Sequence, residues 1–299
     1  MCGIVGLYFK SAALEQQLGR MLAAMLVQMT ERGPDSAGVA VYRRPVGAEA
    51  SKITLQSGDD ANWDDIHARI RAALAPEATL EPLANHAVLT LHGDGAQAAD
   101  WLEANLPGVN ITSIGRAIEI YKEKGRPDEV IARFKLEEMA GSHALGHTRM
   151  ATESAVTTEH SHPFSTGLDL CLVHNGSLSN HNRLREKLRA EGIRFRTDND
   201  SEVAAGYLTW RLSQGATLKE AMQSAIADLD GFYTFAIGAR DGFAVMRDPI
   251  ACKPAILAET EHWVAMSSEY RAIAQLPGSK HAAIWEPQPA RIYSWERAA

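Results

Sequence analysis

The chain opens with the sequence MCGIVGLYF at residues 1–9, where Cys2 directly follows Met1 and residues 4–9 form a short apolar run typical of a buried strand. A small second residue permits removal of Met1. Cys2 would then carry a thiol nucleophile and a free α-amine able to act as its base. Free cysteine is also among the most buried residue types, so position alone leaves two interpretations of Cys2, a buried strand residue or a nucleophile.

Composition limits the class of protein. The chain has 299 residues, 45% of them hydrophobic and 22% charged, which is ordinary globular usage. A net charge of -7 and the lack of a Lys/Arg-rich patch argue against nucleic-acid partners. No apolar run is long enough to span a membrane and no secretory leader is apparent, so we expect a cytoplasmic protein. Cys2, Cys171 and Cys252 lack metal-ligand spacing, and we expect free thiols and no metal site.

The hydrophobic pattern predicts an α+β fold in which sheets pack face to face with helices outside. The middle of the chain, about residues 50–140, differs in composition from the rest and has no recognisable catalytic motif. Its HGDG sequence at 92–95 is better explained by a turn than by a phosphate-binding loop. Expected helices cover residues 14–29, 63–74, 128–139, 201–212 and 218–229, and expected strands cover residues 4–9, 39–42, 87–91, 169–174, 232–239 and 243–246.

Four short clusters follow Cys2 in a fixed order. They are RGPDSAG at 32–38, GHTRMAT at 146–152, HNG at 174–176 and NDSE at 199–202. Together with the N-terminal CGIVG, this set resembles the class II, N-terminal-nucleophile (Ntn) glutamine amidotransferases. The resemblance extends to about residue 270 and is interrupted by the middle stretch. It implies a four-layer αββα sandwich of two antiparallel sheets, formed by a single domain over residues 1–299 with an inserted α/β segment at about 50–140.

The resemblance assigns the chemistry of amide hydrolysis to three residues. Cys2 would attack the side-chain amide of glutamine. The side-chain NH2 of Asn175 and the backbone N–H of Gly176 would stabilise the resulting oxyanion. We expect structural hydrogen-bonding roles for His147 and His174, because the Cys2 amine already supplies a base.

Substrate binding is assigned in the same way. The resemblance places Arg149 on the α-carboxylate of glutamine, where its guanidinium fork matches two oxygens, and Asp200 on the α-ammonium group. It places Thr152 in the pocket wall, and Arg32 with Gly33 in a loop that approaches the nucleophile. Taken singly, Arg149 could be a surface ion-pair residue and Asp200 a helix N-cap.

Two further segments resemble a narrower group. GRAIEIYK at 115–122 and TESAVTTEHSHPF at 152–164 look like the separate amidotransferase subunit of glutamate-synthase-like systems, in particular the small subunit of N-methylglutamate synthase. That resemblance implies synthase partner subunits, which would hold FMN and iron-sulfur clusters, and no cofactor on this chain. The net charge of -7 and the lack of a long apolar run, rather than the resemblance, argue against nucleic-acid and membrane partners.

Two alternatives remain at the level of sequence. One is an Ntn amidohydrolase acting on another amide, which would not need the opposite charges of Arg149 and Asp200 at the two ends of its substrate. The other is a non-catalytic structural subunit of the same complex. Retention of Met1 would favour the second alternative, because a blocked amine cannot serve as the base.

Overall fold

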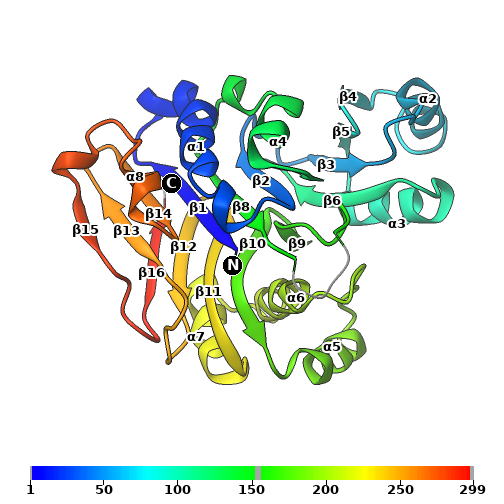
Figure 1. Ribbon diagram of the computed structural model, residues 1–299. Helices are drawn as coiled ribbons and strands as arrows, with labels where there is room; N and C mark the ends of the chain where they lie inside the picture. The colour runs from blue at the N-terminus through cyan, green and yellow to red at the C-terminus, as the bar shows by residue number, and fades with distance from the viewer. Residues whose placement is uncertain (1, 152–155, 297–299) are drawn as a thin grey trace.

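The computed structural model describes residues 2–151 and 156–296, whose strands form three sheets (Figure 1). The seven-stranded sheet has the order β15-β13-β14-β1-β8-β2-β7, with β1 Gly3–Phe9, β2 Ser36–Tyr42, β7 Ile118–Lys124, β8 His143–Arg149, β13 Ile256–Glu259, β14 Trp263–Ser267 and β15 Ala283–Trp285. The five-stranded sheet has the order β16-β12-β11-β10-β9, with β9 Phe164–Gly167, β10 Leu170–Leu178, β11 Gly231–Ala239, β12 Gly242–Arg247 and β16 Ile292–Glu296.

The two large sheets pack against each other and carry helices on their outer faces. Alternation along β1 shows how: Val5 and Leu7 belong to the core beneath the helices, whereas Ile4 and Tyr8 belong to the core between the sheets. The helices are α1 Leu18–Val27, α4 Pro127–Arg133 and α8 Tyr270–Ile273 on the seven-stranded sheet, and α5 His181–Ala190, α6 Asp200–Ser213 and α7 Leu218–Asp228 on the five-stranded sheet. The predicted α+β class with antiparallel sheets is confirmed.

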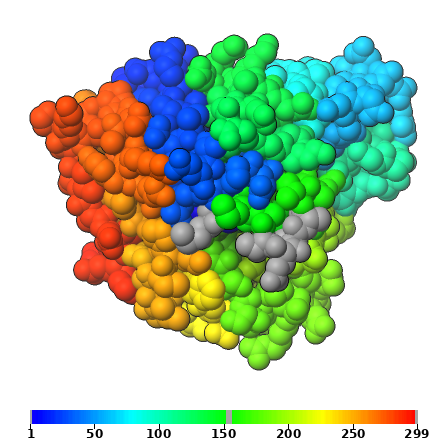
Figure 2. Space-filling model, viewed as in Figure 1, coloured from blue at the N-terminus to red at the C-terminus, as the bar shows by residue number. Residues whose placement is uncertain are grey.

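The middle stretch builds a lobe with its own core. Its four-stranded sheet has the order β4-β5-β3-β6, with β3 Ala50–Gln56, β4 Thr79–Leu83, β5 His86–His92 and β6 Asn110–Gly115, and is covered by α2 Trp63–Ala73 and α3 Gly95–Asn105. Figure 2 shows this lobe, in cyan and light blue, projecting from one corner of the molecule. The chain then returns to the main body, where β7 forms the edge of the seven-stranded sheet.

Two expectations for the middle stretch were tested by the fold. The helix predicted over residues 128–139 is wrong in extent, because α4 ends at Arg133 and only a 3-10 turn follows at Leu136–Glu138. Lys135 has a positive φ of 49°, which turns the chain so that Phe134 and Leu136 both enter the core. The HGDG sequence, expected to be a turn, runs from the last residue of β5 through a bend at Gly93 to the first residue of α3, and the Asp94 side chain caps α3 by accepting a hydrogen bond from Ala96 N at 2.7 Å.

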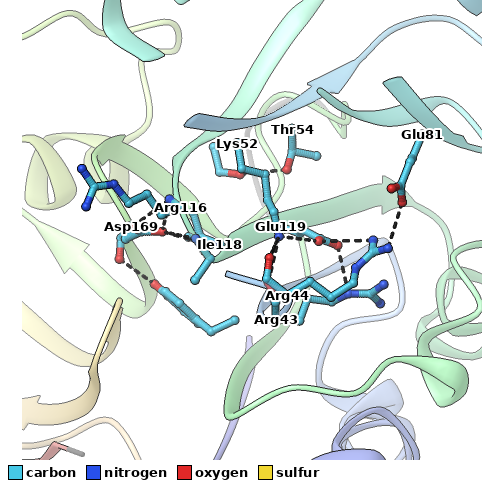
Figure 3. Close-up of polar contacts among 12 residues, drawn as sticks. Arg43, Arg44, Lys52, Thr54, Glu81, Arg116, Ile118, Glu119 and Asp169 are labelled. Atoms are coloured by element: carbon cyan, nitrogen blue, oxygen red, sulfur yellow. Dashed lines mark hydrogen bonds and ion pairs between the residues drawn. The ribbon is translucent and has the colours of Figure 1, made fainter. Parts of the chain in front are cut away.

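A buried carboxylate fastens the lobe to the body (Figure 3). Glu119 on β7 is fully buried and receives the Lys52 ammonium from β3 at 3.0 Å, with Arg43 and Arg44 at 3.4 and 3.6 Å. Lys52 also donates to the carbonyls of Arg43 and Arg44. Burial lowers the pKa of Lys52, although Glu119 opposes that shift. Removing one member of such a buried set leaves uncompensated charge, so we expect this junction to be rigid.

A second carboxylate holds the exit from the lobe. Asp169, in the turn before β10, accepts hydrogen bonds from the backbone N–H groups of Arg116, Ala117 and Ile118 at 2.8 to 3.1 Å (Figure 3). Its own carbonyl accepts the Tyr42 hydroxyl at 3.0 Å. Asp169 therefore connects the two large sheets and the end of the lobe. None of the described helices is long and apolar enough to cross a membrane.

Candidate active site

Cys2 lies immediately before β1 and is partly exposed. Its carbonyl oxygen accepts a hydrogen bond from Arg32 Nε at 3.0 Å and another from Asn175 Nδ2 at 3.3 Å. The next residue, Gly3, pairs with Thr148 on β8. Three segments distant in sequence therefore meet at the predicted nucleophile.

The Arg32-Gly33 loop fits closely against β8. A Cβ atom at Gly33 would lie 2.5 Å from the backbone nitrogen of Arg149, so only glycine allows this approach. The Arg32 guanidinium also pairs with Glu269 at 2.9 Å. The loop thus fixes Cys2 and the end of β8 at the same time.

Arg149 is the last residue of β8 and its side chain is largely buried. Its carbonyl accepts a hydrogen bond from Asp35 N at 3.1 Å, and the Asp35 carboxylate accepts one from Ala151 N at 2.7 Å. Asp35 therefore holds the chain on both sides of Met150. Thr152, which the resemblance placed in the pocket wall, lies outside the described residues.

Asn175 and Gly176 lie side by side on β10. Asn175 is 3% exposed, so its amide is held within the protein. Gly176 has a positive φ of 151°, and a Cβ atom there would lie 2.0 Å from the carbonyl oxygen of Phe232. Both the backbone conformation and the close approach exclude a larger residue.

Asp200 is the first residue of α6, but it is not the helix cap. Asn199 caps the helix by accepting a hydrogen bond from Ser201 N at 2.8 Å. Asp200 instead accepts hydrogen bonds from Leu178 N at 2.9 Å and from Ser201 Oγ at 3.2 Å, with His174 Nδ1 at 3.7 Å. Burial alone would raise its pKa. The contacts with His174, Leu178 and Ser201 outweigh burial and lower the pKa to about 2, so the carboxylate stays ionised.

Three buried histidines lie behind these residues. His147 Nε2 contacts the carbonyl of His174 at 3.0 Å, and the His147 ring stacks on His162 with centroids 4.0 Å apart. Burial lowers the pKa of His147 to about 3 and that of His162 well below its usual range, so both rings are neutral. His174 Nδ1 contacts Ser201 Oγ at 2.9 Å. Sequence reasoning assigned no role to His162 or Ser201, although both stand in quoted segments, because no local pattern predicts the contact between them.

The other two cysteines lie apart from this site. Cys171 is fully buried on β10, where burial raises its pKa to about 12, and Cys252 is exposed. Within the described residues, no group of three or more His, Cys, Asp and Glu side chains is arranged to hold a metal ion. A cavity of about 890 Å³ between the lobe and the body is lined by Arg116, Arg240 and Asp241 and does not include Cys2.

Residues 147–275 match the family described as the glutamine amidotransferase domain. The chain is 52% identical over 300 residues to the glutamine amidotransferase-like protein GlxB of Rhizobium meliloti (strain 1021), covering 99% of this chain and 98% of that protein. It is 32% identical over 168 residues to the amidophosphoribosyltransferase of Methanocaldococcus jannaschii, covering 55% of this chain and 36% of that protein.

Solved structures share the fold. The glutamine phosphoribosylpyrophosphate amidotransferase of B. subtilis has a TM-score of 0.61 at 19% identity, and a structure described as the allosteric regulatory enzyme of purine biosynthesis has a TM-score of 0.63 at 19% identity. Both alignments cover 99% of this chain, which spans about half the length of those chains, 49% and 47%. The fold agrees with the match over the full length of GlxB, and the chain belongs to the class II glutamine amidotransferase family.

Proposed function

We propose that this protein is a glutaminase subunit that hydrolyses the side-chain amide of L-glutamine at Cys2 and delivers the nitrogen to a synthase partner. The observation that supports it best is the pair of hydrogen bonds from Arg32 and Asn175 to the Cys2 carbonyl. They hold the nucleophile beside the amide group of Asn175. Met1 is removed in the mature protein, so that the α-amine of Cys2 is free.

The first step forms a bond between the Cys2 sulfur and the amide carbon of glutamine. The thiol proton passes to the α-amine of Cys2, and the carbonyl oxygen becomes an oxyanion. Donors must lie where that charge develops, and Asn175 with Gly176 supplies an amide and a backbone N–H. One such donor typically stabilises the transition state by about 2.7–4 kcal/mol.

The amino-acid end of glutamine carries two opposite charges. Arg149 pairs with the α-carboxylate and the ionised Asp200 with the α-ammonium group. The low pKa of Asp200, about 2, keeps this partner charged throughout the physiological range. An amide substrate without these charges would form neither ion pair, which favours glutamine over other amides.

The second step breaks the carbon–nitrogen bond. The Cys2 ammonium returns its proton to the leaving nitrogen, ammonia departs, and a γ-glutamyl thioester remains on Cys2. Water then attacks the thioester with the same amine as base. The products are glutamate and the free thiol, which restores the starting state.

Ammonia released into bulk water would be diluted and protonated, so a glutaminase gains from an adjacent acceptor site. We place that site on synthase subunits of a glutamate-synthase-like complex, with N-methylglutamate synthase as the specific candidate, on the resemblance of residues 115–122 and 152–164. FMN and iron-sulfur clusters belong to those partners in this proposal. Isolation of the native complex and identification of its other chains tests this assignment.

The nucleophile is tested by a diazo-ketone analogue of glutamine. The native complex is incubated with the analogue and then examined by intact mass and peptide mapping. We expect one adduct, on a Cys2 that lacks Met1, and none in Cys2→Ala. An unmodified Cys2 in a complex that still hydrolyses glutamine would overturn the proposal.

A further inference from the structure

Three residues form a row across neighbouring strands of the seven-stranded sheet. Gly38 on β2 pairs with His147 on β8 and with Lys122 on β7. Directly opposed residues in antiparallel strands point to the same face of a sheet. Because the middle member lacks a side chain, the row is a cradle with His147 at one end and Lys122 at the other.

The chain segment at residues 159–163 lies in this cradle. The His162 ring stacks on His147 at an interplanar angle of 15°. A Cβ atom on Gly38 would lie 2.1 Å from the His162 carbonyl oxygen, so the backbone of the segment occupies the space above Gly38. The position of residues 159–163 therefore depends on the His147 ring and on the absence of a side chain at Gly38.

Lys122 holds the segment by its backbone. The ammonium donates to the carbonyls of Glu159, Ser161 and Pro163 at 3.1, 2.8 and 3.5 Å. Its three protons are thus used on three carbonyls of one turn, which Ser161 N closes by donating to the Thr158 carbonyl at 3.2 Å. Lys122 is 6% exposed, so no bulk water replaces these contacts.

His162 links residues 159–163 to the candidate active site by hydrogen bonds. The backbone N–H of His174 donates to His162 Nδ1 at 3.4 Å, so Nδ1 is an acceptor and Nε2 carries the proton. His162 Nε2 then donates to Ser201 Oγ at 3.3 Å, which also contacts Asp200. His162 is thus bonded to the residues next to Asn175 and Asp200.

We propose that Lys122 is a positioning residue of the glutaminase site, acting through residues 159–163 and His162. It sets the placement of the oxyanion donors and of the group that receives the substrate ammonium. The inference rests on the proposed function of Cys2. It gives β7 and residues 159–163 a part in amide cleavage.

The charges around Lys122 make its role pH-dependent. Burial lowers its pKa to about 8, with Glu202 and Glu159 opposing that shift and Arg196 adding to it. Below that pH the ammonium can satisfy all three carbonyls. Above it, the neutral amine has two protons and no charge, and the segment loosens.

The test compares Lys122→Met and Lys122→Arg with Lys52→Met in the native complex. The readouts are the rate of Cys2 labelling by the diazo-ketone analogue, kcat and KM for glutamine, and thermal unfolding. Lys52 is a matched control, since it is also a buried lysine bonded to backbone carbonyls, but it lies at the lobe junction. We expect Lys122→Met to slow labelling at least about tenfold, with a fall in kcat and a rise in KM.

Lys122→Arg should recover most of the labelling rate, because it keeps donors and charge and a cavity of about 80 Å³ adjoins Lys122. The ratio of wild-type to Lys122→Arg labelling should fall above about pH 8, since arginine does not titrate there and Cys2 is common to both proteins. Lys52→Met should lower the unfolding temperature but label like wild type.

Wild-type labelling rates in folded Lys122→Met would overturn the role of Lys122 alone. An equal loss of labelling in Lys52→Met would also overturn it, because general destabilisation would then explain both variants. A wild-type complex in which Cys2 is not labelled would overturn the proposed function itself.

Discussion

Asp200 accepts a hydrogen bond from the backbone N–H of Leu178 at 2.9 Å, which joins the first turn of α6 to the strand that carries Asn175 and Gly176. The proposed acceptor of the substrate ammonium and the proposed oxyanion donors are therefore parts of one rigid unit. A displacement of either element would disturb both binding and catalysis.

The low pKa of Asp200 predicts a pH-dependent contribution to stability. A carboxyl with a folded pKa of about 2 and a reference value of 3.8 stabilises the fold above pH 4 by roughly 2 kcal/mol. This contribution is lost as the pH falls from about 4 to about 2. Urea unfolding of wild type and Asp200→Asn should differ most at neutral pH and converge in acid. A constant difference would contradict the assignment.

The oxyanion assignment predicts a loss of turnover in Asn175→Ala. Removing the amide should lower kcat for glutamine by about a hundredfold to a thousandfold, with a smaller change in KM, because the donor acts mainly in the transition state. Asn180→Ala is the control, since Asn180 is a partly exposed residue just before α5 whose amide donates to the Asp228 carbonyl. Steady-state kinetics that show equal effects for the two variants would exclude the assignment.

Gly33→Ala should weaken glutamine binding by displacing Arg149. The added methyl would meet the Arg149 backbone at 2.5 Å, whereas at Gly47 a methyl would meet nothing within 4 Å. Gly33 has a φ of -160°, so the effect is steric and not conformational. KM should rise at least about tenfold in Gly33→Ala and stay near wild type in Gly47→Ala. Equal KM values would show that the contact tolerates a methyl.

The lobe junction predicts a large loss of stability in Glu119→Gln. Lys52 and Arg43 would lose the charge that compensates them, which typically costs about 3–5 kcal/mol. Glu81→Gln removes an exposed partner of the same Arg44 and should change the free energy of unfolding by less than about 1 kcal/mol. Urea unfolding measures both. Similar losses in the two variants would mean that burial of Glu119 adds nothing.

The sequence could predict site residues only where they stand next to one another in a short motif. Asn175 with Gly176, and Arg32 with Gly33, each stand in a short cluster, and the structure brings them to Cys2. Asp200 was placed beside a helix start by pattern, but the pattern could not tell that Asn199 takes the cap. The assigned roles of these residues stay predictions.

What the sequence could not predict depends on contacts between distant segments. Lys122 reads as a polar residue of an edge strand, and its burial arises only when residues 159–163 are laid over Gly38. The end of α4 at Arg133 was missed because burial of Phe134 and Leu136 overrides local helix propensity.

The position of β1 has a consequence for the chain end. Ends of chains usually fray, but β1 is the central strand of its sheet and is paired on both sides, with Gly3 opposite Thr148 and Val5 opposite Ser267. Amide protons at the start of β1 should therefore exchange with deuterium as slowly as those of the core. The proposed nucleophile, Cys2, directly precedes this strand, so we expect its backbone to be held as firmly as the sheet. In the proposed mechanism an affinity tag fused ahead of Cys2 blocks its α-amine, and we expect it to abolish activity without unfolding the protein.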